Sequence, residues 1–388
     1  MDFGLAVTPQ LYFGCGKLSV LPAAIEPFGK KVLLITGAGS FITSQFGNSL
    51  QSALVGRGIG VEYYAVSSEP SPSTIDHAVR KFSSYSPDCI LAIGGGSVLD
   101  AGKAISAMLP LKSPVKDFLE GVGTKAHPGI KVPFIAVPTT SGTGSEATKN
   151  AVISERGDKG YKRSLRHNNF VPNLAIIDPL LTLSCPSSVT AASGMDAFTQ
   201  LLESYVSTAA NPITDALAIE GLECVAGSLA RAYDDGTDVE ARTGMALASY
   251  LSGITLANAG LGLVHGFASP IGGYFAIPHG IICSSLMASA NEVTVRKLRI
   301  GNTNPGALMK YSQVGKLFAR SDYRSQDYYI DFLLHVIQNF TKALKIPPLS
   351  KFGVKPSHYE KIVIAADNKN NPVALDREEM MEVLERSG

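Results

Sequence analysis

The sequence predicts an α/β domain with a mostly parallel sheet, followed by an all-α domain. Two observations support this prediction. Between residue 31 and about residue 180, short aliphatic and β-branched runs alternate with helix-length segments, as in successive βαβ units. After Pro186 the segments become longer, alanine-rich and helically spaced. We therefore expect the α/β domain at 1–182 and the helical domain at 183–388.

Five apolar runs are the expected strands of the α/β domain, at 31–36, 61–66, 89–94, 133–138 and 174–179. In such a sheet, ligands bind outside the carboxyl ends of the strands. Asp178-Pro179 and Cys185-Pro186 then interrupt the chain, and two serines precede an apolar run as a helix start does. Helical spacing follows at 187–207, 214–233 and 239–260.

Bulk composition limits the classes of ligand and compartment. The chain has 388 residues, long enough for two cores, with 34 Lys and Arg against 33 Asp and Glu, a net charge of +1. This balance gives no reason to expect a nucleic-acid or membrane partner, so small molecules are the expected ligands. The five cysteines are scattered and never form a CxxC pair. Together with the absence of a basic leader or a long apolar stretch, they predict a cytoplasmic protein with free thiols.

Two polar loops are expected at the ends of neighbouring strands. Gly94, Gly95, Gly96 and Ser97 follow the run at 89–94 and open a helix, so that free backbone amides and the helix dipole can bind a pyrophosphate. The alternative is an ordinary turn. The next loop carries hydroxyl groups suited to phosphate and ribose, although it could equally be a solvated Ser/Thr loop. Its members are Thr139, Thr140, Ser141, Thr143 and Ser145. Two such loops in one crevice favour a dinucleotide.

A third glycine turn follows the first expected strand, where the adenosine ribose of a dinucleotide is usually bound. It contains Gly37, Gly39 and Ser40 and no carboxylate that would repel a 2′-phosphate. This favours NADP(H), whereas an acid from elsewhere in the fold would favour NAD(H).

Asp196, His265 and His279 are the candidate metal ligands. One carboxylate and two imidazoles can hold a divalent cation with a coordination position left open. The alternative is that both histidines, which stand in a strongly apolar segment, are core residues. Gln200 lies one helical turn after Asp196 and could face the same ion, although an amide oxygen is a poor ligand for zinc or ferrous iron. Glu203 shares that face, and we assign it to helix capping or to pairing within the core.

Five ordered motifs resemble the iron-containing (group III) alcohol dehydrogenase family from about residue 5 to the end. They are GGGSVLDAGK, PTTSGTGSEAT, LAIIDPLLT, GMDAFTQLLESYVS and HGFASPIGGYFAIPHG. The resemblance implies a Rossmann-like domain of the dehydroquinate synthase-like fold, a helical metal-binding domain, and NAD(P)-linked oxidation of a small alcohol to its aldehyde or ketone at Fe²⁺ or Zn²⁺ in the interdomain cleft. It also implies a homodimer.

The same resemblance implies the roles of individual residues. Asp196, His265 and His279 take three metal-ligand positions. The cofactor positions are Gly95, Gly96, Ser97, Thr139, Thr140 and Ser145, with Lys162 nearby, and we group Asp100 of the same motif with them.

Two positions depart from the family pattern. Family members usually carry histidine where this chain has Gln200, as a fourth ligand, and where it has Ser269. The first change leaves a three-ligand site like that of the glycerol dehydrogenase branch, and the second removes a candidate proton relay. Two alternatives therefore stay open: a lyase resembling dehydroquinate synthase, and a cofactor-binding homologue with weak or lost catalysis.

Overall fold

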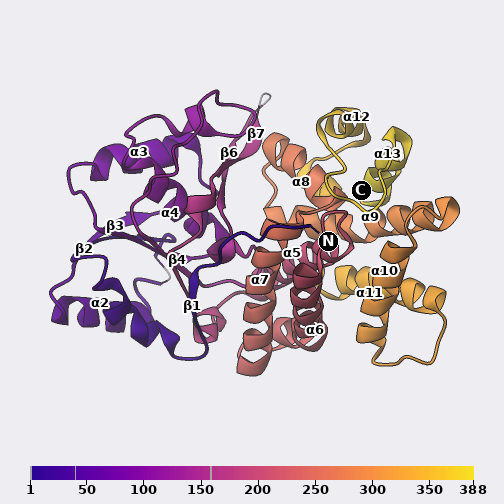
Figure 1. Cartoon of the computed structure of the whole chain (residues 1–388), viewed down its shortest axis with the longest axis horizontal. Coiled ribbons are helices and arrows are strands. Elements are labelled where there is room, and N and C mark those ends of the chain that lie inside the picture. The colour runs from indigo at the N-terminus through magenta and orange to yellow at the C-terminus, as the bar shows by residue number, and fades with distance from the viewer. Residues whose placement is uncertain (1, 40, 158–159) are drawn as a thin grey trace. The chain divides into compact units, whose positions relative to one another are not determined.

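The computed structural model describes residues 2–39, 41–157 and 160–388 (Figure 1). By its internal contacts the described chain forms two compact units. One comprises Ala6–Glu155 and Lys162–Cys185. The other comprises Pro186–Gly388 with the described residues of Met1–Leu5 and Arg156–Tyr161.

The first unit is built on a six-stranded parallel sheet of order β1-β8-β5-β4-β2-β3. Its strands are β1 (Gln10–Phe13), β2 (Lys31–Thr36), β3 (Gly60–Ala65), β4 (Cys89–Gly94), β5 (Phe134–Pro138) and β8 (Leu174–Ile177). The unit's α-helices are α1 (Leu21–Ile25), α2 (Gln45–Gly56), α3 (Pro72–Phe82) and α4 (Gly96–Met108). The predicted parallel α/β domain is confirmed, and all five expected strands are present.

The strands β1, β6 (Asn150–Glu155) and β7 (Tyr161–Arg166) were not expected from the sequence. β1 has only four residues, all at least partly exposed, at an edge of the large sheet, so its apolar run is too short to identify a strand. β6 and β7 form a separate two-stranded sheet, and three of the six residues of β7 are charged. Short or two-sided strands of this kind lack the apolar signal on which the prediction depended.

The order of the strands indicates where a ligand crevice lies in the first unit. From β2 the chain runs to β3 on one side, and it then returns to form β4 on the other side of β2. Thr36 pairs with Ile93 and Gly94 with Pro138, so β2, β4 and β5 end at the same edge of the sheet. The carboxyl ends of strands flanking such a reversal are where open α/β sheets bind ligands.

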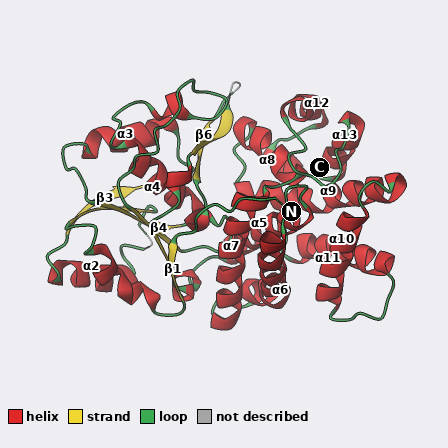
Figure 2. Ribbon diagram, in the orientation of Figure 1, coloured by secondary structure: helices red, strands yellow, loops and turns green. Residues whose placement is uncertain are grey.

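The second unit is helical apart from loops and short turns, as Figure 2 shows in red. Its helices are α5 (Ser187–Val206), α6 (Pro212–Asp234), α7 (Val239–Ala259), α8 (Leu263–Tyr274), α9 (His279–Gly301), α10 (Pro305–Ala319), α11 (Gln326–Ala343), α12 (Pro356–Ala365) and α13 (Arg377–Arg386). The predicted all-α carboxy-terminal domain is confirmed. α5 is its central helix and packs against α6, α7 and α9.

Short 3₁₀ turns complete the described chain: Lys17–Val20, Val115–Phe118, Ser145–Ala147, Asn168–Phe170, Pro179–Thr182 and Leu349–Phe352. Among the described helices, none alone is both long and apolar enough to cross a membrane. The pair α7 and α8, bent by 99°, meets that test only when the two are joined.

Candidate functional site

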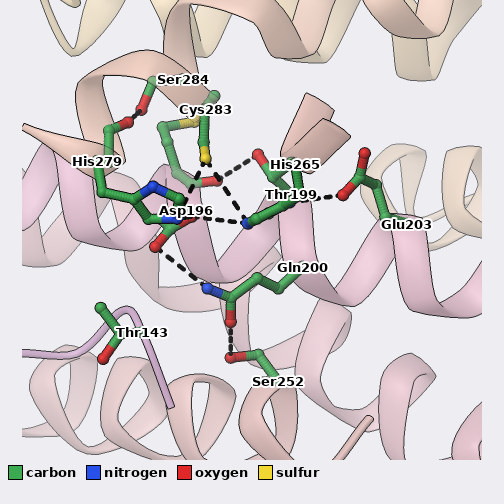
Figure 3. Close-up of polar contacts among 12 residues, drawn as sticks. Thr143, Asp196, Thr199, Gln200, Glu203, Ser252, His265, His279, Cys283 and Ser284 are labelled. Atoms are coloured by element: carbon green, nitrogen blue, oxygen red, sulfur yellow. Dashed lines mark hydrogen bonds and ion pairs between the residues drawn. The ribbon is translucent and has the colours of Figure 1, made fainter. Parts of the chain in front are cut away.

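Three helices of the second unit bring the candidate metal ligands together. Asp196 lies in α5, His265 in the first turn of α8, and His279 is the first residue of α9. Figure 3 shows their side chains facing one another, with Cys283 of α9 beside them. One ligand atom from each of these four residues lies within 4.8 Å of the others.

Two glycines allow the helix ends that carry the histidines to approach their neighbours closely. A Cβ atom at Gly280 would lie 2.6 Å from the backbone oxygen of Ala192, so only glycine lets the start of α9 contact α5 here. A Cβ atom at Gly266 would lie 1.8 Å from the backbone oxygen of Asp367. The close packing at Gly280 fixes where His279 enters the site.

The distances in this cluster suit a divalent cation. Asp196 Oδ1 lies 3.4 Å from His265 Nε2 and 3.9 Å from His279 Nε2. Bonds of about 2.0–2.3 Å to a tetrahedral ion place neighbouring ligand atoms about 3.3–3.8 Å apart. Asp196 is 1% exposed, and its Oδ1 accepts no hydrogen bond from any residue that the structure describes. A buried carboxylate oxygen of this kind is costly unless a cation or donor occupies the space it faces.

Glu203 determines which nitrogen of His265 faces the cluster. His265 Nδ1 donates to Glu203 Oε2 at 2.6 Å, and the backbone nitrogen of Val264 donates to Oε1 at 2.7 Å. With its proton on Nδ1, the neutral imidazole presents the Nε2 lone pair to an ion. Glu203 therefore does form a pair in the core, and its partner is a candidate metal ligand. Its position seven residues after Asp196, on the same helix face, could have indicated this role from the sequence.

Gln200 contacts the ligand carboxylate with its nitrogen. Gln200 Nε2 donates to Asp196 Oδ2 at 3.1 Å, and its Oε1 accepts from Ser252 Oγ at 2.7 Å. The amide oxygen, which is the only atom of this side chain that could bind an ion, is therefore already hydrogen-bonded. In this arrangement Gln200 orients Asp196 and leaves Oδ1 directed into the cluster.

Cys283 was not singled out from the sequence, where the cysteines were compared only with one another. Its Sγ lies 3.6 Å from His265 Nε2 and 3.7 Å from His279 Nε2. Cys283 follows His279 by four residues in α9, so the two share a helix face. That His-x₃-Cys spacing is the signal by which the sequence could have indicated it.

The protonation of the site follows from burial and mutual charge. Burial raises the pKa of Asp196, but the adjacent His279 and His265 outweigh this, and the net pKa is lowered. Burial alone lowers the pKa of His265, whereas Cys283, Glu203 and Asp196 raise it well above its ordinary value. Burial raises the pKa of the Cys283 thiol to about 12. Without an ion, the cluster would therefore hold an ionised Asp196, a protonated His265 and a neutral thiol, and an ion would have to displace the proton on His265 Nε2.

The candidate cofactor residues lie in the first unit, at the ends of β2, β4 and β5. Gly37 and Gly39 follow β2, Gly94–Ser97 span the end of β4 and the start of α4, and Thr139–Thr143 follow β5. Ser40 lies outside the described residues. A Cβ atom at Gly96 would lie 2.6 Å from the Thr143 side chain. The glycine loop (94–97) and the hydroxyl loop (139–145) are therefore in contact, as expected for one crevice.

Within the hydroxyl loop, exposure separates two groups of residues. Thr139, Thr140, Ser141 and Thr143 are partly exposed, whereas Ser145 is buried. Ser145 Oγ donates to Asp100 Oδ1 at 2.5 Å. Ser145 and Asp100 thus bind each other, and we expect them to shape the loop.

Two lysines support this crevice from inside the unit. Lys103 Nζ donates to Ser145 O at 2.7 Å, Thr148 Oγ1 at 2.9 Å and Asn150 O at 2.8 Å. Lys162 Nζ is paired with Glu69 Oε1 at 2.7 Å, which offsets the burial of its charge. Lys103 was not identified from the sequence, because a lysine on a helix is ordinarily exposed.

Two models of one known protein family match this chain, one over each half of the sequence. The model of the iron-containing alcohol dehydrogenase family matches residues 8–179, and that of the carboxy-terminal domain of the same family matches residues 190–388. The chain belongs to the iron-containing alcohol dehydrogenase family. The predicted family membership is thereby confirmed.

Relatives of this iron-containing alcohol dehydrogenase match it over nearly its whole length. Alcohol dehydrogenase 4 of Saccharomyces cerevisiae is 31% identical, with 99% of this chain and 98% of the relative covered. NADPH-dependent butanol dehydrogenase of Clostridium saccharobutylicum is 30% identical, with 97% and 95% covered. A crystal structure of a 1,3-propanediol oxidoreductase has a TM-score of 0.89 at 27% identity and covers 100% of both chains. The expected activity class, an alcohol dehydrogenase of this family, is confirmed.

For this dehydrogenase we expect Glu203→Gln to weaken binding of a divalent metal. An amide accepts a hydrogen bond from His265 Nδ1 less strongly than a carboxylate, and loss of such a supporting contact usually costs about 10–100-fold in metal affinity. Competition with a chromophoric chelator measures the affinity, with Glu223→Gln, an exposed glutamate of α6, as the matched control. Equal affinities in the two variants would show that Glu203 does not support the site.

Proposed function

We propose that the chain catalyses reversible hydride transfer between NADP(H) or NAD(H) and a small alcohol/aldehyde or alcohol/ketone pair, with a divalent cation held by Asp196, His265 and His279. The observation that carries this proposal is the convergence of these side chains on the buried, unsatisfied Asp196 Oδ1. Fe²⁺ and Zn²⁺ both accept such a set of carboxylate and imidazole ligands. When bound, such an ion polarises a carbonyl group or lowers the pKa of an alcohol.

Within the cluster, one residue would compensate the charge of the ion and two others orient the ligands. Asp196 offsets the positive charge of a cation, and Gln200 holds the second carboxylate oxygen so that Oδ1 keeps its direction. Glu203 keeps one proton of His265 on Nδ1, so that Nε2 is the nitrogen that would bind an ion once its own proton is displaced. These contacts fix the orientation of the two ligand side chains.

We assign cofactor binding to the loops at the ends of β2, β4 and β5. The helix α4 begins at Gly96 without a side-chain cap, so its first backbone amides are available to a pyrophosphate. Thr139, Thr140 and Thr143 offer hydroxyl groups beside it. Because the turn at 37–40 has no carboxylate, we expect NADP(H) to bind more tightly than NAD(H).

The lyase alternative is disfavoured by the charges of the metal-binding segments. A site that eliminates phosphate needs Lys or Arg side chains to bind it. Residues 194–205 and 262–282, which carry the candidate ligands, contain neither.

We further propose a cytoplasmic homodimer. All five cysteines carry thiols rather than disulfides, which suits a reducing compartment. Light scattering after size exclusion measures the oligomeric state.

Turnover with a defined metal tests the proposed function. The protein is stripped with a chelator, loaded with Zn²⁺ or, under argon, Fe²⁺, and mixed with NADPH or NADH and a panel of short aldehydes. We expect reduced-nicotinamide absorbance to fall only in the loaded samples and faster with NADPH. If neither metal supports turnover with either cofactor, the chain is a cofactor-binding homologue and the proposal fails.

A further inference from the structure

The three proposed ligands leave the identity of a fourth ligand open, and one side chain occupies the remaining side of the cluster. Cys283 is buried, and its Sγ faces the same space as Asp196 Oδ1 and the two histidine Nε2 atoms (Figure 3). It comes from α9, the helix that also supplies His279. No backbone shift is needed to bring it there.

The distances match the edges of a tetrahedron. With Zn–S bonds of about 2.3 Å and Zn–N bonds of about 2.0–2.1 Å, the sulfur and nitrogen atoms of one site lie about 3.5–3.6 Å apart. Cys283 Sγ is 3.6 Å from His265 Nε2 and 3.7 Å from His279 Nε2. Of the two Asp196–histidine edges, the one to His265, at 3.4 Å, suits a tetrahedral ion, and the one to His279, at 3.9 Å, is longer. Three of the six edges thus fit one central ion to within about 0.1 Å.

Gln200 is the competing candidate for this position, and its contacts argue against it. Its oxygen accepts from Ser252 and its nitrogen donates to Asp196. To bind an ion it would have to give up the first of these contacts and turn its amide. Cys283 needs only to lose the proton on sulfur.

We propose that Cys283 is the fourth protein ligand, as a thiolate, in an Asp-His-His-Cys site that binds Zn²⁺ in preference to Fe²⁺. This inference rests on the proposed function, because it presumes an ion between Asp196, His265 and His279. Thiolate is a soft ligand that favours zinc, and the general order of divalent affinities also places zinc above ferrous iron. On binding, the S–H bond breaks, a sulfur–metal bond forms, and the proton passes to solvent.

Cobalt substitution tests the inference in the whole protein. The chain is stripped of metal and titrated with Co²⁺ under argon, since a cobalt–thiolate bond gives an intense charge-transfer band in the near ultraviolet that carboxylate and imidazole ligands do not give. We expect this band to saturate at one ion per chain. It should be absent in Cys283→Ser and unchanged in Cys224→Ser, a control thiol of α6 outside the cluster.

Affinity and a direct structural measurement complete the test. We expect Cys283→Ser to lower Zn²⁺ affinity by about 100-fold or more, since even supporting contacts cost about 10–100-fold. X-ray absorption of the zinc-loaded wild type, which needs no variant, should show a sulfur neighbour at about 2.3 Å. Competition between Zn²⁺ and Fe²⁺ on the wild type should favour zinc.

The outcomes separate this inference from the proposed function. One bound ion with no charge-transfer band and no sulfur neighbour overturns the role of Cys283 but leaves the metal-dependent function standing. Equal Zn²⁺ affinity in Cys283→Ser and Cys224→Ser overturns it as well. If no ion binds at all, both the inference and the proposed function fail.

Discussion

Asp196→Ala is expected to reduce metal-dependent kcat/KM by about 10³-fold or more, a loss of about 4 kcal/mol of transition-state stabilisation. Asp196 supplies the one anionic oxygen of the proposed three-ligand set that accepts no hydrogen bond from the described residues. Without it, two neutral imidazoles must hold the ion, and the positive charge is not offset. Steady-state kinetics with saturating Zn²⁺, followed by the reduced-nicotinamide band, give the ratio.

Two controls make this result specific. Thr199→Ser changes a buried neighbour in α5 whose hydroxyl bonds only to the backbone of its own helix, at Met195 O, and it should keep wild-type kinetics. Binding of NADPH, which we assign to the other unit, should be equal in the Asp196→Ala variant and the wild type. Full activity in Asp196→Ala would contradict the assignment of this residue as a ligand.

Lys103→Met is expected to lower the free energy of unfolding by about 3–5 kcal/mol and to weaken NADPH binding. Lys103 is 1% exposed, and burial lowers its pKa to about 8, with Asp100 and Glu146 acting in the opposite direction. Methionine fills a similar volume but leaves the backbone oxygens of Ser145 and Asn150 without this donor. The hydroxyl loop that follows β5 then loses its main support.

Denaturant titration and NADPH titration measure these two effects. Lys81→Met, which changes an exposed lysine near the end of α3, is the control and should alter neither quantity measurably. A Lys103→Met protein with wild-type stability and cofactor affinity would show that the buried ammonium group does not hold the loop.

The sequence predicted the parts of this fold that carry a regular apolar signal. β2, β4, β5 and β8 are buried along their whole length or nearly so, and each appeared as a continuous apolar run. β7 did not, because it mixes charged residues with buried ones in a small sheet. The helices α5, α6 and α7 were recognisable from alanine-rich spacing, but which faces meet depends on packing that no local pattern records.

The candidate site was predicted in part, for a similar reason. Asp196, His265 and His279 stand out by type and context, whereas Cys283 and Glu203 are marked in the sequence only by their spacing from His279 and Asp196, and their roles follow from the contacts they make. Cys283 looks like a core thiol until His265 of another helix is placed 3.6 Å away. Ser145, which we expect at the cofactor, also donates to Asp100, a contact that the sequence does not reveal because it joins a helix residue to a distant loop.

Anomalous diffraction from crystals soaked in Zn²⁺ tests the central claim most directly, because it locates the ion and identifies it. The account predicts one strong peak at the zinc edge, about 2.0–2.2 Å from Asp196 Oδ1 and from the Nε2 atoms of His265 and His279. A map with only water among these side chains in excess Zn²⁺, or with the three pointing apart, would contradict it.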